Sequence, residues 1–184
     1  MNEEEDIIIK DMVQNSYNNP NEFVRWNDEE LGVRVYELGE NEFLITHRGT
    51  SLNRGNDLKA DISIALGFYK SNDLFNDRLK ATKTIIENIK KDNPDVKIII
   101  GGHSLGGKTA EFSLQDEYIF NNVEHGELFS VFRPQIENDK VDYNRISGDI
   151  LSTGPATKKN KIGFWPTRFG TIARAVYGHS IGFF

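Results

Sequence analysis

Residues 101–110, with the sequence GGHSLGGKTA, follow the apolar run at residues 96–100 and constrain the fold more than any other segment. The segment matches two catalytic motifs. Residues 102–106 read G-x-S-x-G, the sharp turn that presents a serine hydroxyl above a sheet. Residues 102–109 read G-x-x-x-x-G-K-T, the phosphate-binding P-loop. Because both motifs need a strand, a glycine-rich turn and a helix N-terminus, the rest of the chain must decide between acyl transfer and phosphate binding.

The composition predicts one globular domain. A length of 184 residues fits a single core, so we expect residues 1–6, with the acidic sequence MNEEED, to form a flexible tail and residues 7–184 to form the domain. The net charge of −6 argues against nucleic acid as a partner, because phosphate binding needs a basic surface. The absence of cysteine excludes disulfides, thiolate catalysis and cysteine-ligated zinc.

The chain also lacks the sequence features of secretion and membrane insertion. Its beginning has neither the basic region nor the apolar stretch of a signal peptide. No run approaches the roughly 18 apolar residues of a transmembrane segment. We therefore expect a cytoplasmic or virion-associated protein.

The order of the predicted elements favours a largely parallel α/β sheet, because strands and helices alternate over residues 73–146. The predicted strands are residues 33–38, 42–47, 96–100, 128–132 and 141–146, the first two forming a hairpin. The predicted helices are residues 6–15, 73–91 and 105 to about 120. Residues 152–163 are predicted to be a loop.

The residues that follow the glycine-rich turn favour the serine motif. A P-loop protein normally has an apolar strand that ends in an aspartate, which helps to hold Mg²⁺. The nearest candidate, Asp149, is separated from Ile146 by two residues. The serine motif instead requires an acid and then a histidine further along the chain. Asp149 and His179 follow Ser104 in this order, so nucleotide binding is the weaker interpretation.

Four short motifs resemble those of the class 3 lipase family of α/β hydrolases. They are HRGTS at 47–51, GHSLGG at 102–107, SGDIL at 147–151 and YGHSIG at 177–182. The resemblance implies an α/β-hydrolase fold with a reduced, mostly parallel central sheet and flanking helices. It implies hydrolysis of carboxylic esters, with lipid or phospholipid acyl esters as substrates, no cofactor and no metal. The alternatives are a soluble esterase or thioesterase on small acyl substrates, and a non-catalytic structural protein, such as a virion component, on the same scaffold.

The resemblance also assigns a catalytic triad. Ser104 is the expected nucleophile, His179 the general base, and Asp149 the acid that orients the imidazole. For Ser104 the plain alternative is a helix cap. The alternative candidates for the base and the acid are His125, Asp139 and Asp142.

Neighbouring residues complete the expected site. The backbone N–H groups of Leu105 and Thr50 are the expected oxyanion-hole donors. We expect His103, next to the nucleophile, to pack or line the site. His47 stands at a strand end where the family often has an apolar residue, and we expect a structural role for it. Lys108 stands where a small residue is usual, so the packing of the following helix is expected to differ.

Two segments bear on the substrate. The family carries a lid with an apolar underside after the HRGT motif, but residues 52–59 are short and mostly polar, with Leu52 and Leu58 as their apolar residues. We therefore expect little interfacial activation. Residues 158–174 interleave basic and aromatic side chains, which favours docking on an anionic membrane surface, although the aromatic residues could instead close the core. The predicted lipid contacts are Lys158, Lys159, Phe164 and Trp165.

Overall fold

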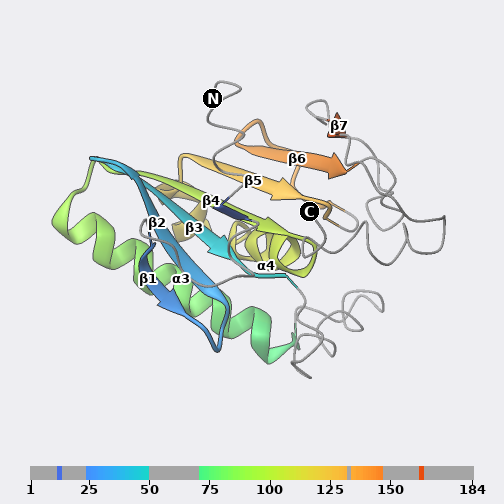
Figure 1. Ribbon diagram of the computed structural model, residues 1–184, viewed down its shortest axis with the longest axis horizontal. Coiled ribbons are helices and arrows are strands. Elements are labelled where there is room, and N and C mark those ends of the chain that lie inside the picture. The colour runs from blue at the N-terminus through green and yellow to red at the C-terminus, as the bar shows by residue number, and fades with distance from the viewer. Residues whose placement is uncertain (1–11, 14–23, 50–70, 132–133, 147–161, 164–184) are drawn as a thin grey trace.

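Within the described residues, seven strands form one sheet in the order of the chain (Figure 1). The computed structural model describes residues 12–13, 24–49, 71–131, 134–146 and 162–163. The strands are β1 (Val24–Asp28), β2 (Val33–Gly39), β3 (Glu42–His47), β4 (Lys97–His103), β5 (His125–Phe129), β6 (Val141–Ile146) and β7 (Ile162–Gly163).

The sheet changes from antiparallel to parallel pairing at β3. β1 pairs antiparallel with β2, and β2 forms the predicted hairpin with β3. From β3 to β7 each strand is parallel to the next. Parallel neighbours need a crossover connection, and helices provide it between β3 and β4 and between β4 and β5. The predicted mostly parallel α/β sheet with flanking helices is confirmed.

Three helices of the described residues connect these strands: α3 (Asp73–Asp92), α4 (Leu105–Ser113) and α5 (Glu117–Asn122). The side chain of Asn72 caps α3 by accepting from the backbone N–H of Leu74. The prediction of one helix from 105 to about 120 is wrong. α4 ends at Ser113, and Asp116 begins α5 because its carboxylate accepts from the N–H of Ile119.

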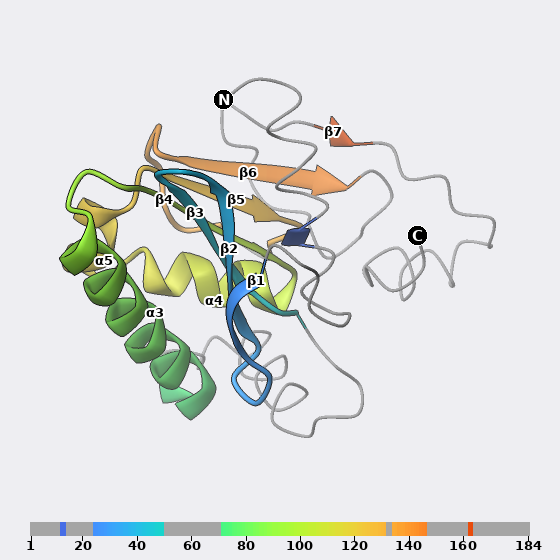
Figure 2. The same ribbon diagram turned by 60° about the vertical axis from the view of Figure 1, so that its left-hand side comes forward.

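Successive strand residues point to opposite faces of the sheet and pack into two apolar clusters. On one face, which α3, α4 and α5 cover (Figure 2), strand residues such as Ile98, Ile100 and Leu128 pack with residues of these helices. The opposite face carries Tyr36, Leu44, Ile99 and Phe129, which pack with Met12 and Val13. Met12 and Val13 are helical, as predicted for residues 6–15.

Three strands differ from their predictions. β1 and the short β7 were not expected, and β7 lies at the end of the predicted loop 152–163. β5 begins at His125 rather than at residue 128. The prediction starts too late because the first residues of β5 include His125 and Glu127, which bond to each other, and polar residues do not indicate a buried strand. Among the described residues, no helix combines the length and the apolar character that a bilayer crossing needs.

Candidate active site

The turn between β4 and α4 has the geometry of a nucleophile elbow. His103 ends β4 and Leu105 begins α4, so Ser104 is the single residue between them. Ser104 has a φ of 57° and a ψ of −120°, a conformation that L-residues rarely adopt. Its backbone N–H donates to the carbonyl oxygen of Phe129 at 2.9 Å, which ties the turn to the end of β5.

Ser104 does not act as an ordinary helix cap. It occupies the N-cap position of α4, but its side chain makes no capping hydrogen bond. An N-cap serine normally has an extended backbone and accepts from an N–H of the first helical turn. The helix-cap interpretation is therefore wrong. A strained residue at this point is typical of a serine whose hydroxyl is presented at the end of a sheet.

Glycines on both sides of Ser104 let the strand, the turn and the helix approach closely. A Cβ atom on Gly102 would lie 2.5 Å from the carbonyl carbon and oxygen of Gly106. A Cβ atom on Gly106 would lie 2.0 Å from the carbonyl oxygen of His47. Both contacts are with backbone, which cannot move aside as a flexible side chain can. The two glycines of the G-x-S-x-G motif are thus required by packing.

The end of β3 lies directly against the first turn of α4, and buried side chains hold it there. The Arg48 N–H donates to the carbonyl oxygen of Gly32 at 2.7 Å. The Nη1 of Arg78, on α3, donates to the carbonyl oxygen of Arg48 at 2.8 Å and to Oγ1 of Thr109 at 3.1 Å. Arg78 therefore joins the segment before Thr50 to the helix that follows Ser104.

His47 is buried beneath this contact. Its Nδ1 lies 3.1 Å from Oγ1 of Thr109, and its Nε2 lies 3.0 Å from Oγ1 of Thr82. Burial and, as the smaller cause, the positive charge of Arg78 together lower the pKa of His47 to about 3. The imidazole is thus neutral and links β3, α3 and α4. The expected structural role of His47 is confirmed.

The lysine of the P-loop pattern points into the protein. Lys108 and Glu111 form a buried ion pair on α4. Glu111 also accepts from the hydroxyl of Tyr143 and from the N–H of Gln135. Burial, together with the Glu111 charge, raises the pKa of Tyr143. With its ammonium group paired inside the core, Lys108 is not presented to a phosphate, so the P-loop interpretation does not fit.

The alternative acids and base lie at the other edge of the sheet. The carboxyl ends of β3, β4, β5 and β6 point to the same side, and Ser104 follows one of them (Figure 1). His125 begins β5, four residues before Phe129, a separation of roughly 13 Å along a strand. Asp142 is the second residue of β6, and Asp139 precedes that strand. The fold therefore does not bring these three residues to Ser104.

Of the predicted site residues, Ser104 and Leu105 are described. Leu105 is buried and begins α4, so its N–H cannot bond within the helix and is directed outward at the helix N-terminus. The other predicted site residues lie outside the described residues. They are Thr50, Leu52, Leu58, Asp149, Lys158, Lys159, Phe164, Trp165 and His179.

The sequence does not indicate the roles of two residues near the elbow. Arg78 appears there as an ordinary basic residue of an amphipathic helix, and only its complete burial reveals its role. Ser130 directly follows β5 and is the other non-glycine residue of the described chain with a positive φ, 51°. Its N–H donates to the carbonyl oxygen of Asn144 at 2.8 Å. Neither residue carries a local signal, because both roles depend on contacts between distant segments.

The chain is similar in fold to solved structures of fungal lipases. The lipase from Rhizopus microsporus var. chinensis is 15% identical, with a TM-score of 0.56 over 81% of this chain and 67% of that one. A triacylglyceride lipase of Rhizomucor miehei is 15% identical, with a TM-score of 0.54 over 88% and 79% of the two chains. A propeptide complex of the Rhizomucor miehei lipase is 16% identical, with a TM-score of 0.50 over 81% and 62%.

The sequence comparison gives the family. The chain spans 62% to 79% of the length of the three fungal lipases, and identities this low establish the fold alone. No curated protein matches the chain significantly by sequence. The family model described as lipase (class 3) matches residues 38–140, more than half of the chain, including the end of β3 and the whole elbow. The chain therefore belongs to the class 3 lipase family of ester-hydrolysing enzymes.

Proposed function

We propose that this chain hydrolyses acyl esters of lipids through an acyl-enzyme formed on Ser104. The observation that carries the proposal is the strained backbone of Ser104 between β4 and α4, with no capping bond from its side chain. A φ of 57° at a non-glycine residue costs on the order of 1–3 kcal/mol and persists where the surrounding structure imposes it. Here Gly102 and Gly106 allow the strand and the helix to pack closely on either side of Ser104.

The proposed reaction follows the chemistry of a serine triad. Ser104 Oγ attacks the ester carbonyl carbon while His179 takes the hydroxyl proton and then gives it to the departing alcohol. A water molecule, deprotonated by His179, next attacks the acyl-enzyme, and His179 returns the proton to Ser104 Oγ as the carboxylic acid leaves. Asp149 stabilises the charged imidazole. The N–H groups of Leu105 and Thr50 stabilise the oxyanion, each being worth about 3–4 kcal/mol in the transition state.

The geometry of the sheet supports this choice of residues. Thr50 comes three positions after His47, and the end of β3 is fixed against the first turn of α4 by Arg78 and Gly106. Asp149 comes three positions after Ile146, the last residue of β6. Since β6 is parallel to β4 and β5, its carboxyl end lies at the edge of the sheet where Ser104 stands.

For the substrate we propose a phospholipid or another lipid ester bound from a membrane surface. The basic and aromatic residues Lys158, Lys159, Phe164 and Trp165 would supply the surface contact. The Rhizomucor miehei relative is a triacylglyceride lipase, so neutral fat is the natural comparison. Rates on phospholipid vesicles, triacylglycerol emulsions and short nitrophenyl esters separate the three substrate classes. A preference for the short soluble esters would replace the lipid proposal with an esterase.

The test of the nucleophile is labelling by a fluorophosphonate probe, read as intact mass. Wild type should gain one adduct, and Ser104→Ala should gain none. Ser113→Ala is the matched control, because Ser113 is a buried serine of the same helix whose hydroxyl donates to the carbonyl oxygen of Thr109 in the preceding turn. It should label like wild type. A folded wild-type protein that takes no adduct, or a Ser104→Ala protein that still takes one, would contradict the proposal.

A further inference from the structure

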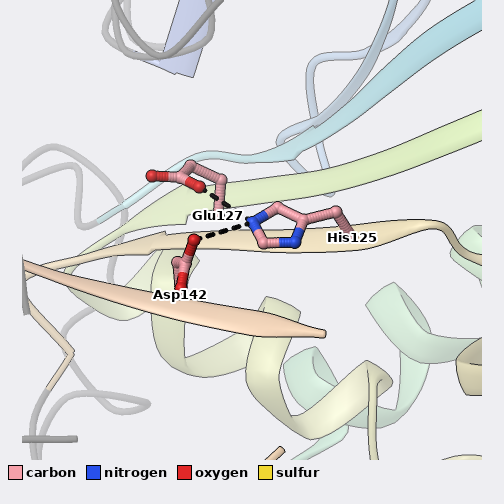
Figure 3. A group of neighbouring side chains, drawn as sticks. All are labelled: His125, Glu127 and Asp142. Carbon is pink, nitrogen blue, oxygen red and sulfur yellow. Dashed lines mark hydrogen bonds and ion pairs between the residues drawn. The ribbon is translucent and has the colours of Figure 1, made fainter. Parts of the chain in front are cut away.

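Three metal-ligating side chains converge where β5 and β6 pair, two to four residues before the carboxyl ends of these strands. His125 Nε2 lies 3.0 Å from Oε2 of Glu127 and 3.4 Å from Oδ2 of Asp142 (Figure 3). One ligand atom from each residue lies within 4.8 Å of the other two. His125 and Glu127 share a face of β5, and Glu127 is directly paired with Asp142 across the parallel strands.

The negative charges of the two carboxylates in this cluster favour a bound cation. Both carboxylates are directed at the same imidazole nitrogen, which carries at most one hydrogen (Figure 3). The side chain of Glu127 is 1% exposed and that of Asp142 12% exposed. Two carboxylates withdrawn from water are costly unless a positive charge balances them. A divalent cation bound between the two carboxylates would balance both charges.

Two of the three separations in the cluster match those of ligands around a small metal ion. Nitrogen and oxygen ligands lie about 2.0–2.2 Å from zinc, so neighbouring ligands of a tetrahedral or octahedral ion are about 2.8–3.6 Å apart. The separations of 3.0 and 3.4 Å from His125 Nε2 fall in this range.

A neighbouring amide orients one of the ligands. Asn144, two residues after Asp142 on β6, donates its Nδ2 hydrogen to Oε1 of Glu127. This bond fixes the carboxylate and leaves Oε2 directed at His125, as outer hydrogen bonds do in metal sites. The His125 side chain is 17% exposed, which provides a route for the ion and for a water molecule as the next ligand.

We propose that His125, Glu127 and Asp142 form a binding site for a divalent transition-metal ion. One imidazole and two carboxylates suit zinc or manganese, whereas calcium and magnesium favour oxygen ligands alone. The ion would join β5 to β6 and stabilise the fold, apart from ester hydrolysis at Ser104. This proposal departs from the metal-free expectation of the sequence, and it does not depend on the proposed function.

The test uses the tag-free full chain, treated with EDTA and dialysed. Titration calorimetry with Zn²⁺ should give one saturable site, and Zn²⁺ should raise the melting temperature. Co²⁺ should bind at the same site and produce visible absorption bands. His125→Ala and Asp142→Asn should each weaken Zn²⁺ binding by roughly tenfold or more. Glu124→Gln is the matched control, because it removes an exposed carboxylate next to the cluster, and it should bind Zn²⁺ like wild type.

The outcomes separate a metal site from an ion pair. If the cluster is only a protonated imidazole between two carboxylates, wild type will show no saturable Zn²⁺ binding and no change in melting temperature with EDTA. Binding that is equally strong in wild type, His125→Ala and Asp142→Asn would place the ion elsewhere. Either result overturns the proposal. Glu127→Gln, which keeps the volume of the buried side chain, provides a third ligand variant if His125→Ala proves unfolded.

Discussion

At the scale of single residues, the site is built on positions that are unfavourable by themselves. Ser104 has a strained backbone, His47 is a buried imidazole, and Lys108 is a buried ammonium group. Each is compensated by named partners, which for His47 are the hydroxyls of Thr82 and Thr109. Sequence motifs identified Ser104, because its glycine neighbours are local. The partners of His47 could not be predicted, because Thr82 and Thr109 come from other elements of the fold. Glu111, the partner of Lys108, lies on the same helix, and what could not be predicted is that the pair is buried.

His47 makes stability depend on pH. Its pKa is about 3 in the folded protein, lowered by burial and by Arg78, and about 6.5 in an unfolded chain. Below pH 6.5 the unfolded chain therefore binds a proton that the folded protein does not. The contribution of the neutral imidazole is fully present above about pH 6.5 and is lost as the pH falls towards 3, by about 1.4 kcal/mol per pH unit.

The variant His47→Gln should lack this dependence. Urea unfolding of wild type and His47→Gln at about pH 7 and about pH 5 measures it, and wild type should lose more stability on acidification by about 1–2 kcal/mol. Equal losses in the two proteins would mean that His47 is protonated in the folded state. His47→Asn serves as a second non-titrating variant if glutamine does not fit between Thr82 and Thr109.

At the scale of elements, local sequence patterns predict the secondary structure correctly where it depends on one segment alone. The β2–β3 hairpin, α3 and β4 follow from turn residues, an amphipathic stripe and an apolar run. The division of α4 from α5 was missed, because it depends on one capping carboxylate, that of Asp116. The predicted bounds of β5 are wrong because His125 and Glu127 bond to each other and to β6. The sequence of one strand does not show such contacts.

The contact between β3 and α4 can be tested with one methyl group. In Gly106→Ala the new Cβ would lie 2.0 Å from the carbonyl oxygen of His47, so strand and helix must separate. We expect a loss of about 3 kcal/mol or more in the free energy of unfolding, with loss of probe labelling. Gly39→Ala is the control, because a Cβ there meets no atom within 4 Å, and it should change stability by less than about 1 kcal/mol. Equal, small effects of both changes would contradict the close contact measured at Gly106.

At the scale of the whole molecule, the parallel sheet separates two kinds of chemistry. Its carboxyl edge carries Ser104, and its amino edge carries His125 and Asp142. The sequence order Ser, Asp, His favoured Asp149 and His179, but the sequence alone left the rival residues open. The direction of the strands excludes these rival residues from the triad, because it places them away from Ser104. It also brings His125 and Asp142, far apart in the chain, into one cluster that no linear motif announces.

Strand direction predicts which aspartate serves the reaction. Asp149 follows the carboxyl end of β6, whereas the exposed Asp139 precedes its amino end. Asp149→Asn should lower the rate of ester hydrolysis by up to about 10⁴-fold, because an amide cannot hold the imidazole in the required tautomer. Asp139→Asn makes the same chemical change at the opposite edge and should leave the rate within about twofold of wild type. Hydrolysis of a short nitrophenyl ester by the two folded variants measures both effects. If Asp139→Asn lost activity and Asp149→Asn kept it, the triad would need a different acid. The parallel direction of the strands would then not explain how the catalytic residues come together.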